Sequence, residues 1–110
     1  MAIEYRLMRP EEERAVLALW CRSPTDMPYR AARFASDPDA LAHTYVAVAP
    51  DGTVLSTLHY QVTFRRDATG TPRPVGELDS IGTRPDARRQ GHGTRLLLLA
   101  LEMLRSAGCD

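Results

Sequence analysis

Six residues near the end of the chain combine arginines with glycines, in the order Arg88-Arg89-Gln90-Gly91-His92-Gly93. Glycine lets a backbone approach a ligand closely, and arginine forms charge-assisted hydrogen bonds to anions. The apolar run at residues 96–101 predicts a helix that begins at Gly91 or His92. Because a helix N-terminus carries unpaired N–H groups and partial positive charge, this turn is suited to bind a phosphate group. The alternative is a solvated basic turn before a buried helix.

Two carboxylates precede the turn and are candidate catalytic bases. Glu77 and Asp79 lie two residues apart in a predicted strand, which places both side chains on one face. Neighbouring carboxylates raise the pKa of one of them, the useful direction for a general base near neutral pH. The alternative for each is a solvated residue or an ion pair with arginine. His59, in the preceding strand, is a weaker candidate, because a lone strand histidine is more often a packing or surface residue.

Several other chemistries lack the residues that they need. The chain contains no lysine, which excludes the lysine-bearing phosphate loop and a Schiff base, and it has no Gly-x-Gly-x-x-Gly sequence. Cys21 and Cys109 show no metal-ligand spacing, so no metal is expected. Cys21 and His43 together could suggest a thiol nucleophile, but a packed thiol at the end of an amphipathic helix is the more common case.

The composition indicates one globular domain over residues 1–110, with 44% hydrophobic residues, 25% charged residues and a net charge of zero. The local positive charge is confined to residues 84–95, whereas a nucleic-acid binder is basic over a whole face, so nucleic acid is not an expected partner. The charged first residues do not form a signal peptide, and no apolar run approaches the ~20 residues of a membrane span. We therefore expect a cytoplasmic protein, without a membrane partner, whose thiols are reduced.

The pattern of apolar and turn-forming residues predicts an antiparallel meander with helices packed on it, an α+β layer architecture. Glycines at 76 and 82, inside the last strand, predict a bulge or a close approach by another group. The predicted strands are 3–7, 44–49, 54–64 and 75–83, the helices are 10–21, 27–35 and 91–107, and a polar loop covers 65–74.

Residues 78–99 resemble the acyl-coenzyme A signature of the GNAT acyltransferase superfamily. In that signature a strand leads through proline to Arg/Gln-x-x-Gly-x-Gly/Ala and a leucine-bearing helix. The chain has Thr83-x-Pro85-x-Ala87-Arg88-Arg89-Gln90-Gly91-His92-Gly93-Thr94-Arg95-Leu96 at this place. The order of strands and helices along the whole chain is similar too. The resemblance implies the acyl-CoA N-acyltransferase fold, which has a mixed, mostly antiparallel sheet flanked by helices.

The resemblance also implies acetyl-coenzyme A as the cofactor. Its pantetheine arm would pair with the backbone of Ile81, Gly82 and Thr83, and N–H groups near Gly82 would stabilise the oxyanion. The pyrophosphate would be held mainly by backbone N–H groups, at Arg88, Arg89, Gln90, Gly91, His92, Gly93 and Thr94. The expected activity is acetyl transfer to the primary amine of a small molecule or a protein, by direct attack in a ternary complex.

Members of the superfamily continue after this helix with a further strand, a helix and a closing strand pair. Relative to that pattern the chain corresponds to the N-terminal about two-thirds of the fold, and the sheet edge left open would permit a homo-oligomer. The alternative function is a non-catalytic coenzyme A-binding or protein-interaction module derived from the same fold.

Overall fold

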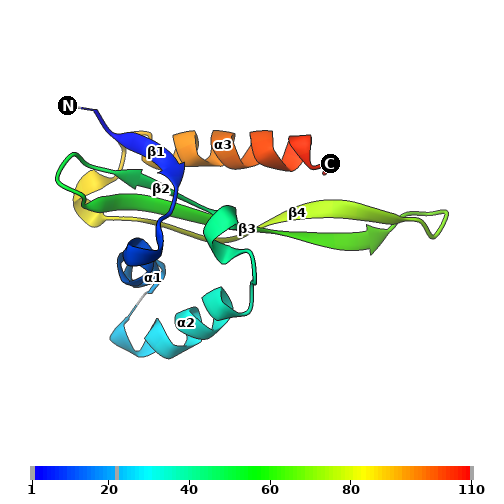
Figure 1. Ribbon diagram of the computed structural model, residues 1–110, viewed down its shortest axis with the longest axis horizontal. Coiled ribbons are helices and arrows are strands. Elements are labelled where there is room, and N and C mark those ends of the chain that lie inside the picture. The colour runs from blue at the N-terminus through cyan, green and yellow to red at the C-terminus, as the bar shows by residue number, and fades with distance from the viewer. Residues whose placement is uncertain (1, 22, 110) are drawn as a thin grey trace.

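The computed structural model describes residues 2–21 and 23–109 and contains one four-stranded sheet. The strands lie in the order β1 (Glu4–Leu7), β2 (Thr44–Val48), β3 (Val54–Arg66) and β4 (Pro72–Thr83), and each neighbouring pair is antiparallel. Helices α1 (Glu13–Trp20) and α2 (Met27–Ala35) lie on one side of the sheet and α3 (His92–Ser106) on the other (Figure 1). The prediction of an α+β layer architecture is confirmed, while the described strands contain no parallel pair.

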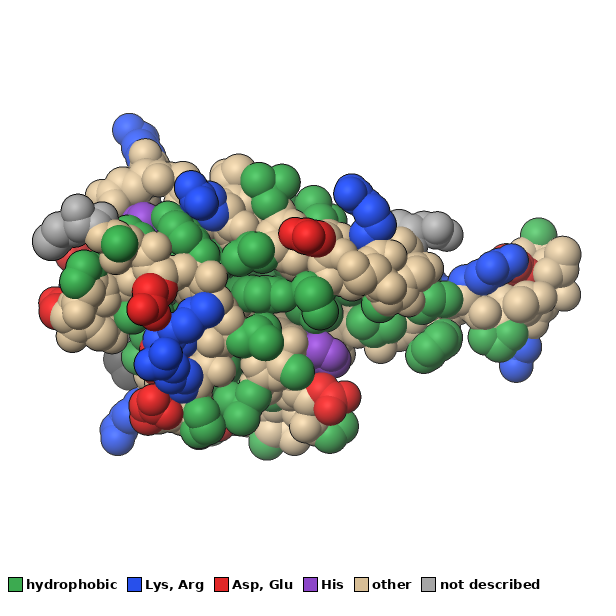
Figure 2. Space-filling view, turned by 45° about the horizontal axis from the view of Figure 1, so that its top comes forward, with side chains coloured by type: hydrophobic (Ala, Val, Ile, Leu, Met, Phe, Trp, Pro, Cys, Tyr) green, Lys and Arg blue, Asp and Glu red, His purple; other side chains and the backbone are tan. Residues whose placement is uncertain are grey.

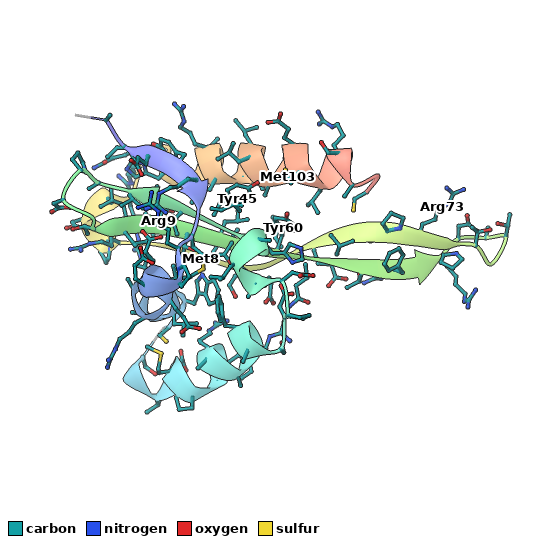
Figure 3. The ribbon with its side chains drawn as sticks, viewed as in Figure 1. Met8, Arg9, Tyr45, Tyr60, Arg73 and Met103 are labelled. Atoms are coloured by element: carbon teal, nitrogen blue, oxygen red, sulfur yellow. The ribbon has the colours of Figure 1, made fainter. Side chains whose placement is uncertain are left out.

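Each face of the sheet has its own apolar core, because alternate residues of a strand point to opposite faces. On the α1 side, the fully buried side chains of Val16 and Val46 belong to one cluster. On the other side, Leu96 of α3 packs with Tyr45 and Tyr60, which lie between the sheet and the helix (Figure 3). The two cores fix α1 and α3 to the sheet and so fix the ends of both helices. No helix within the described residues is long and apolar enough to cross a membrane.

The predicted polar loop at 65–74 is wrong, since the two long strands continue and form an arm that projects from the body (Figures 1 and 2). The connecting turn is limited to residues 67–71, where Asp67 Oδ1 accepts hydrogen bonds from the N–H groups of Thr69 and Thr71 (2.9 and 3.1 Å). Prolines at 72 and 74 suggested a loop. They are tolerated because, among the described strands, β4 lies at the edge of the sheet, where an N–H can be absent.

A bulge interrupts the pairing of β3 with β4. His59 lies opposite Ser80 and Tyr60 lies opposite Leu78, so Asp79 is the extra residue in β4. On either side of the bulge, the predicted close approaches are confirmed. A Cβ at Gly76 would collide with the side chain of Leu104 in α3, and one at Gly82 would collide with a backbone carbonyl of α1. The end of β4 is therefore pressed against α1.

An ion pair joins β1 to the start of the first helix. Glu12 accepts hydrogen bonds from both terminal nitrogens of Arg6, each at 2.8 Å, and from the backbone N–H of Arg9 at 2.7 Å. The hydrogen bonds from Arg6 lower the pKa of Glu12, and the Arg9 N–H acts in the same direction, against the opposing effect of burial. Glu12 thereby holds the segment that leads from the sheet edge into α1.

The pair predicts a pH-dependent contribution to stability. A carboxyl group with a lowered pKa in the folded state stabilises the fold above its unfolded pKa, and this stabilisation is lost as the pH falls through the folded value. We expect Glu12→Gln to lower the free energy of unfolding by about 1–3 kcal/mol near pH 7. Chemical denaturation at several pH values should show the difference from wild type shrinking below the usual pKa of 4.5. A difference that stays constant down to pH 2 would contradict this role.

Candidate functional site

The glycine turn connects β4 to α3 in a conformation that leaves N–H groups free. Arg89 and Gly91, which lie two residues apart, have left-handed backbone angles (φ 66° and 82°). Helix α3 begins at His92. The hydrogen bond from Arg95 N–H to Gly91 O (3.1 Å) closes the first turn of the helix. N–H groups earlier than Arg95 therefore have no acceptor within the helix. The geometry expected for an anion site at this helix N-terminus is present.

The positive charge of the turn is available to a ligand. Arg84 is engaged by Asp86, with Nε and Nη2 at 3.1 and 3.2 Å from its carboxylate oxygens. Arg88 and Arg89 are exposed and form no ion pair with any residue in 2–21 or 23–109. The net positive charge therefore remains on the two arginines that flank the free N–H groups.

His92 contributes its backbone to the turn, because its side chain faces the body of the protein. The ring is 5% exposed; Nδ1 accepts a hydrogen bond from the hydroxyl of Tyr5 (2.8 Å), and Nε2 donates one to Gln90 Oε1 (3.1 Å). These bonds also engage the side chain of Gln90. The side chains of His92 and Gln90 thus stabilise the loop, which leaves the backbone N–H groups of the turn to bind an anion.

A hollow of about 260 Å³ lies directly over the turn. It is lined by Thr83, Ala87, Arg88, Arg89, Gly91, His92, Gly93 and Thr94. A Cβ built at Gly93 has no protein atom within 4 Å, and Gly93 has no left-handed φ, so the fold itself does not require glycine there. The missing side chain leaves room for something outside the chain.

A larger cleft of about 560 Å³ lies along β4. It is lined by Leu19, Trp20, Cys21, Arg30, Asp79, Ser80, Ile81, Gly82, Thr83 and Arg88. Thr83 and Arg88 line both spaces, so the cleft and the hollow adjoin at these two residues. The buried Nε1 of Trp20 and Nε of Arg30 have no hydrogen-bond partner among the described residues. Unpaired buried donors are costly, so these two favour a polar ligand in the cleft.

The two predicted carboxylates occupy different environments. Asp79 lies at the cleft, with its side chain 15% exposed and Oδ1 accepting a hydrogen bond from Arg33 of α2 at 2.5 Å. Glu77 lies further along the arm, 43% exposed, where Oε1 accepts from Arg65 (3.0 Å) and Thr63 (3.4 Å). Glu77 is not among the residues that line the cleft. Of the two, Asp79 is the carboxylate that can reach a bound molecule.

His59 is buried beside Asp79, a placement that the sequence did not indicate. Its ring is 1% exposed, and Nε2 lies 3.9 Å from Asp79 Oδ2 and 3.2 Å from Asp37 Oδ2. Neither Arg33 nor Asp37 could be selected from the sequence, because each reaches the site from outside the sheet. Their only signal was the polar face of the short helix at 27–35 and the turn that follows it.

Cys21 and His43 do not form a nucleophilic pair. The thiol of Cys21 donates to Leu17 O at 3.2 Å, and His43 Nδ1 lies 3.0 Å from Asp37 Oδ2. Within the described residues, no group of three or more His, Cys, Asp or Glu side chains is arranged to hold a metal ion.

Comparison with known proteins identifies the class of protein that this fold and site define. The model of the acetyltransferase (GNAT) family matches residues 5–110, so the chain belongs to that family and is a GNAT-type acetyltransferase domain. Acyl transfer with a coenzyme A-type cofactor is the chemistry of this class. A comparison with curated protein sequences finds no match.

Solved acetyltransferase structures share the fold at low sequence identity. The NatC complex bound to Gag peptide and CoA superimposes with a TM-score of 0.78 at 18% identity, covering 100% of this chain and 71% of that one. A Trypanosoma brucei acetyltransferase gives 0.70 at 21%, covering 98% and 78%. A GNAT family acetyltransferase from Brucella melitensis in complex with acetyl-CoA gives 0.70 at 20%, covering 98% and 71%. The resemblance noted in the sequence is thus confirmed at the level of family and fold.

The geometry of Gly93 predicts opposite effects on stability and binding. Alanine is favoured over glycine in a helix by about 0.5–1 kcal/mol, and its Cβ meets no protein atom, so Gly93→Ala should stabilise the fold. The same Cβ would occupy the hollow, and losing one hydrogen bond to a charged group weakens binding of coenzyme A roughly tenfold or more. Denaturant unfolding measures the first effect, and calorimetric titration with coenzyme A measures the second. A more stable variant with unchanged affinity would place the pyrophosphate elsewhere.

Proposed function

We propose that the chain transfers the acetyl group of acetyl-coenzyme A to a primary amine in a ternary complex. The observation that carries the proposal is that the two spaces adjoin at Thr83 and Arg88, with the glycine turn at one end, the edge of β4 along the middle and Asp79 at the other end. When bound, the cofactor supplies an activated acetyl group on sulfur. A path of this kind suits an elongated ligand with a charged pyrophosphate and a reactive group at its far end.

Each part of the path has residues for one task. The N–H groups of Gly91, His92, Gly93 and Thr94, with Arg88, Arg89 and Gln90 in the same turn, bind the pyrophosphate. The backbone of Ile81, Gly82 and Thr83 follows the cleft at the described edge of β4, where it pairs with the pantetheine arm. Backbone N–H groups near Gly82 stabilise negative charge that develops on the acetyl oxygen.

Asp79 is the base in this proposal. Proton removal from the attacking nitrogen needs a carboxylate within reach of the cleft, directly or through one water. Asp79 lines the cleft, and Arg33 holds Oδ1 so that Oδ2 remains for proton transfer. Glu77, the other carboxylate of β4, is paired with Arg65 on the arm and lies outside the cleft.

The acceptor is an amine on a small molecule or a peptide. The NatC structure contains a Gag peptide, which supports a peptide acceptor as one class to test.

The sheet edge along β4 is a proposed contact for a second copy of the chain. Sedimentation of the purified chain, with and without coenzyme A, tests whether such a dimer forms.

Binding is tested with the chain's single tryptophan, which lines the cleft. Titration with acetyl-coenzyme A and with coenzyme A should change the fluorescence of Trp20, and calorimetry should give matching affinities. Arg88→Ala combined with Gly91→Glu should abolish both signals, because it removes a cation and adds an anion at the turn. Absence of binding by the wild type would overturn the proposal. Binding without turnover on any amine would leave the non-catalytic coenzyme A-binding module as the function.

Substitution of the two carboxylates separates their roles. We expect Asp79→Asn to lower kcat about 10²–10⁴-fold, the usual contribution of a general base, with little change in the affinity for acetyl-coenzyme A. Glu77→Gln is the matched variant and should change kcat less than about twofold, since an exposed ion pair contributes little. The assay measures release of coenzyme A with a panel of primary amines. Loss of activity in Glu77→Gln alone would transfer the role of base to Glu77.

A further inference from the structure

His59 lies at the centre of a buried polar cluster between α2 and the sheet. Asp79 of β4 lies on one side of Nε2 at 3.9 Å, and Asp37, which follows α2, lies on the other at 3.2 Å. Asp37 Oδ2 also lies 3.0 Å from Nδ1 of His43. A single imidazole nitrogen is thus shared by two carboxylates, and one of those carboxylates continues to a second imidazole.

A hydrogen-bond chain fixes which nitrogen of His59 carries a proton. The hydroxyl of Thr44 donates to Ala40 O at 2.7 Å, so its oxygen must accept from His59 Nδ1 at 2.8 Å. His59 is therefore protonated at Nδ1, and only Nε2 gains or loses a proton. Nε2 has no hydrogen-bond partner among the described residues, although two carboxylates face it. Because carboxylates only accept hydrogen bonds, Nε2 is satisfied only while it carries a proton that one of them accepts.

The charged groups around His59 carry a net charge that one additional proton neutralises. The groups that face it are Asp37 after α2, Asp79 of β4, Arg33 of α2 and His43 before β2, with the Trp20 ring at 5.6 Å and the Thr44 hydroxyl. Two carboxylates and one guanidinium carry a net charge of −1, which one shared proton neutralises. Burial lowers the pKa of His59; Asp37 and Asp79 oppose this, and His43 and Arg33 add to it. A proton on Nε2 is therefore held loosely.

The two ends of the cluster open into different spaces. Asp79 lines the cleft along β4, while Asp37 and His43 line a separate hollow with Gln61 and Val62. His59 lies between these spaces and is sealed from solvent. A proton can therefore leave the cleft without passing the bound cofactor.

We propose that His59 is a positioning residue that takes the amine's proton from Asp79 and passes it to Asp37, which releases it into the second hollow. This rests on the proposed acetyl transfer. The nitrogen–carbon bond forms and the carbon–sulfur bond breaks; the nitrogen loses one proton, and the leaving sulfur takes one up from solvent. The nitrogen's proton moves to Asp79 Oδ2, then to His59 Nε2, then to Asp37 Oδ2, and from there to solvent in the second hollow, which Asp37 lines. His43 Nδ1–H donates a hydrogen bond to Asp37 Oδ2 and holds this carboxylate in place. The 3.9 Å gap shortens by rotation of Asp79, as catalytic contacts do on ligand binding.

Nitrogen NMR of the histidine rings tests the cluster without any acceptor amine. In the purified chain, long-range proton–nitrogen spectra from pH 5 to 9 should show His59 protonated at Nδ1 throughout, with only Nε2 titrating. Asp37→Asn should shift the titration of His59, because the Asp37 carboxylate raises the pKa of that ring. A neutral His59 protonated at Nε2, or an unchanged His59 titration in Asp37→Asn, would overturn the relay even if the enzyme is active.

Two substitutions of Thr44 test the relay in catalysis. Thr44→Val keeps the shape but removes the acceptor for Nδ1, so the neutral ring becomes free to protonate at Nε2; Thr44→Ser keeps the hydroxyl and is the matched control. Release of coenzyme A should fall about tenfold or more in Thr44→Val and His59→Gln, with a loss that changes with pH and with the affinity for acetyl-coenzyme A unchanged, and it should be retained in Thr44→Ser. An equal loss at all pH values in all three variants would make His59 a packing residue.

The NMR experiment and the activity experiment distinguish failure of the relay from failure of the proposed function. Expected NMR titrations together with no turnover on any amine would remove the proposed function and, with it, the relay's catalytic role. Turnover with unexpected titrations would keep the function and reject the relay.

Discussion

The close approach of β4 to the end of α1 is the constraint on which the site depends. At Gly82 the strand backbone lies so near to the carbonyl of Leu19 that no side chain fits between them. The contact brings Trp20 and Cys21, at the C-terminal end of α1, beside the strand residues that line the cleft. Any larger residue at position 82 would separate helix from strand and open the wall of the cleft. Glycine at position 82 is required by the packing of β4 on α1, and it shapes the cleft only through this packing.

The bulge at Asp79 is the second determinant, since it divides β4 into two parts with different surroundings. Before the bulge, β4 pairs with β3 along the projecting arm, where the side chain of Phe64 is exposed. Arg73 lies on the same arm (Figure 3). After the bulge, β4 lies against α1, with Gly82 close to Leu19. The inserted residue turns toward Arg33 and His59 and ends in the cleft. A bulge therefore separates two carboxylates that are near neighbours in sequence.

The sequence predicted the parts of the molecule that local patterns determine. Helix α2 was placed correctly at 27–35, and the glycine turn followed from residue types and the apolar run after it. Prolines at 72 and 74 misled the prediction of the arm, because their tolerance depends on an edge position that only the sheet order reveals. The cluster around His59 was missed for a similar reason: Arg33, Asp37 and His59 meet only after α2 has packed on the sheet.

The arm is a ribbon of two strands that receives little support from the rest of the protein, and a two-stranded hairpin alone is only marginally stable in water. Its amide hydrogens are thus exposed to local opening that does not involve the body. The bulge limits how far such an opening extends, because the pairing beyond Ser80 has its own register. Insertions or deletions at the tip of the arm, residues 67–71, should therefore leave the structure of the cleft unchanged. The fold can gain or lose residues there during evolution and keep Asp79 in place.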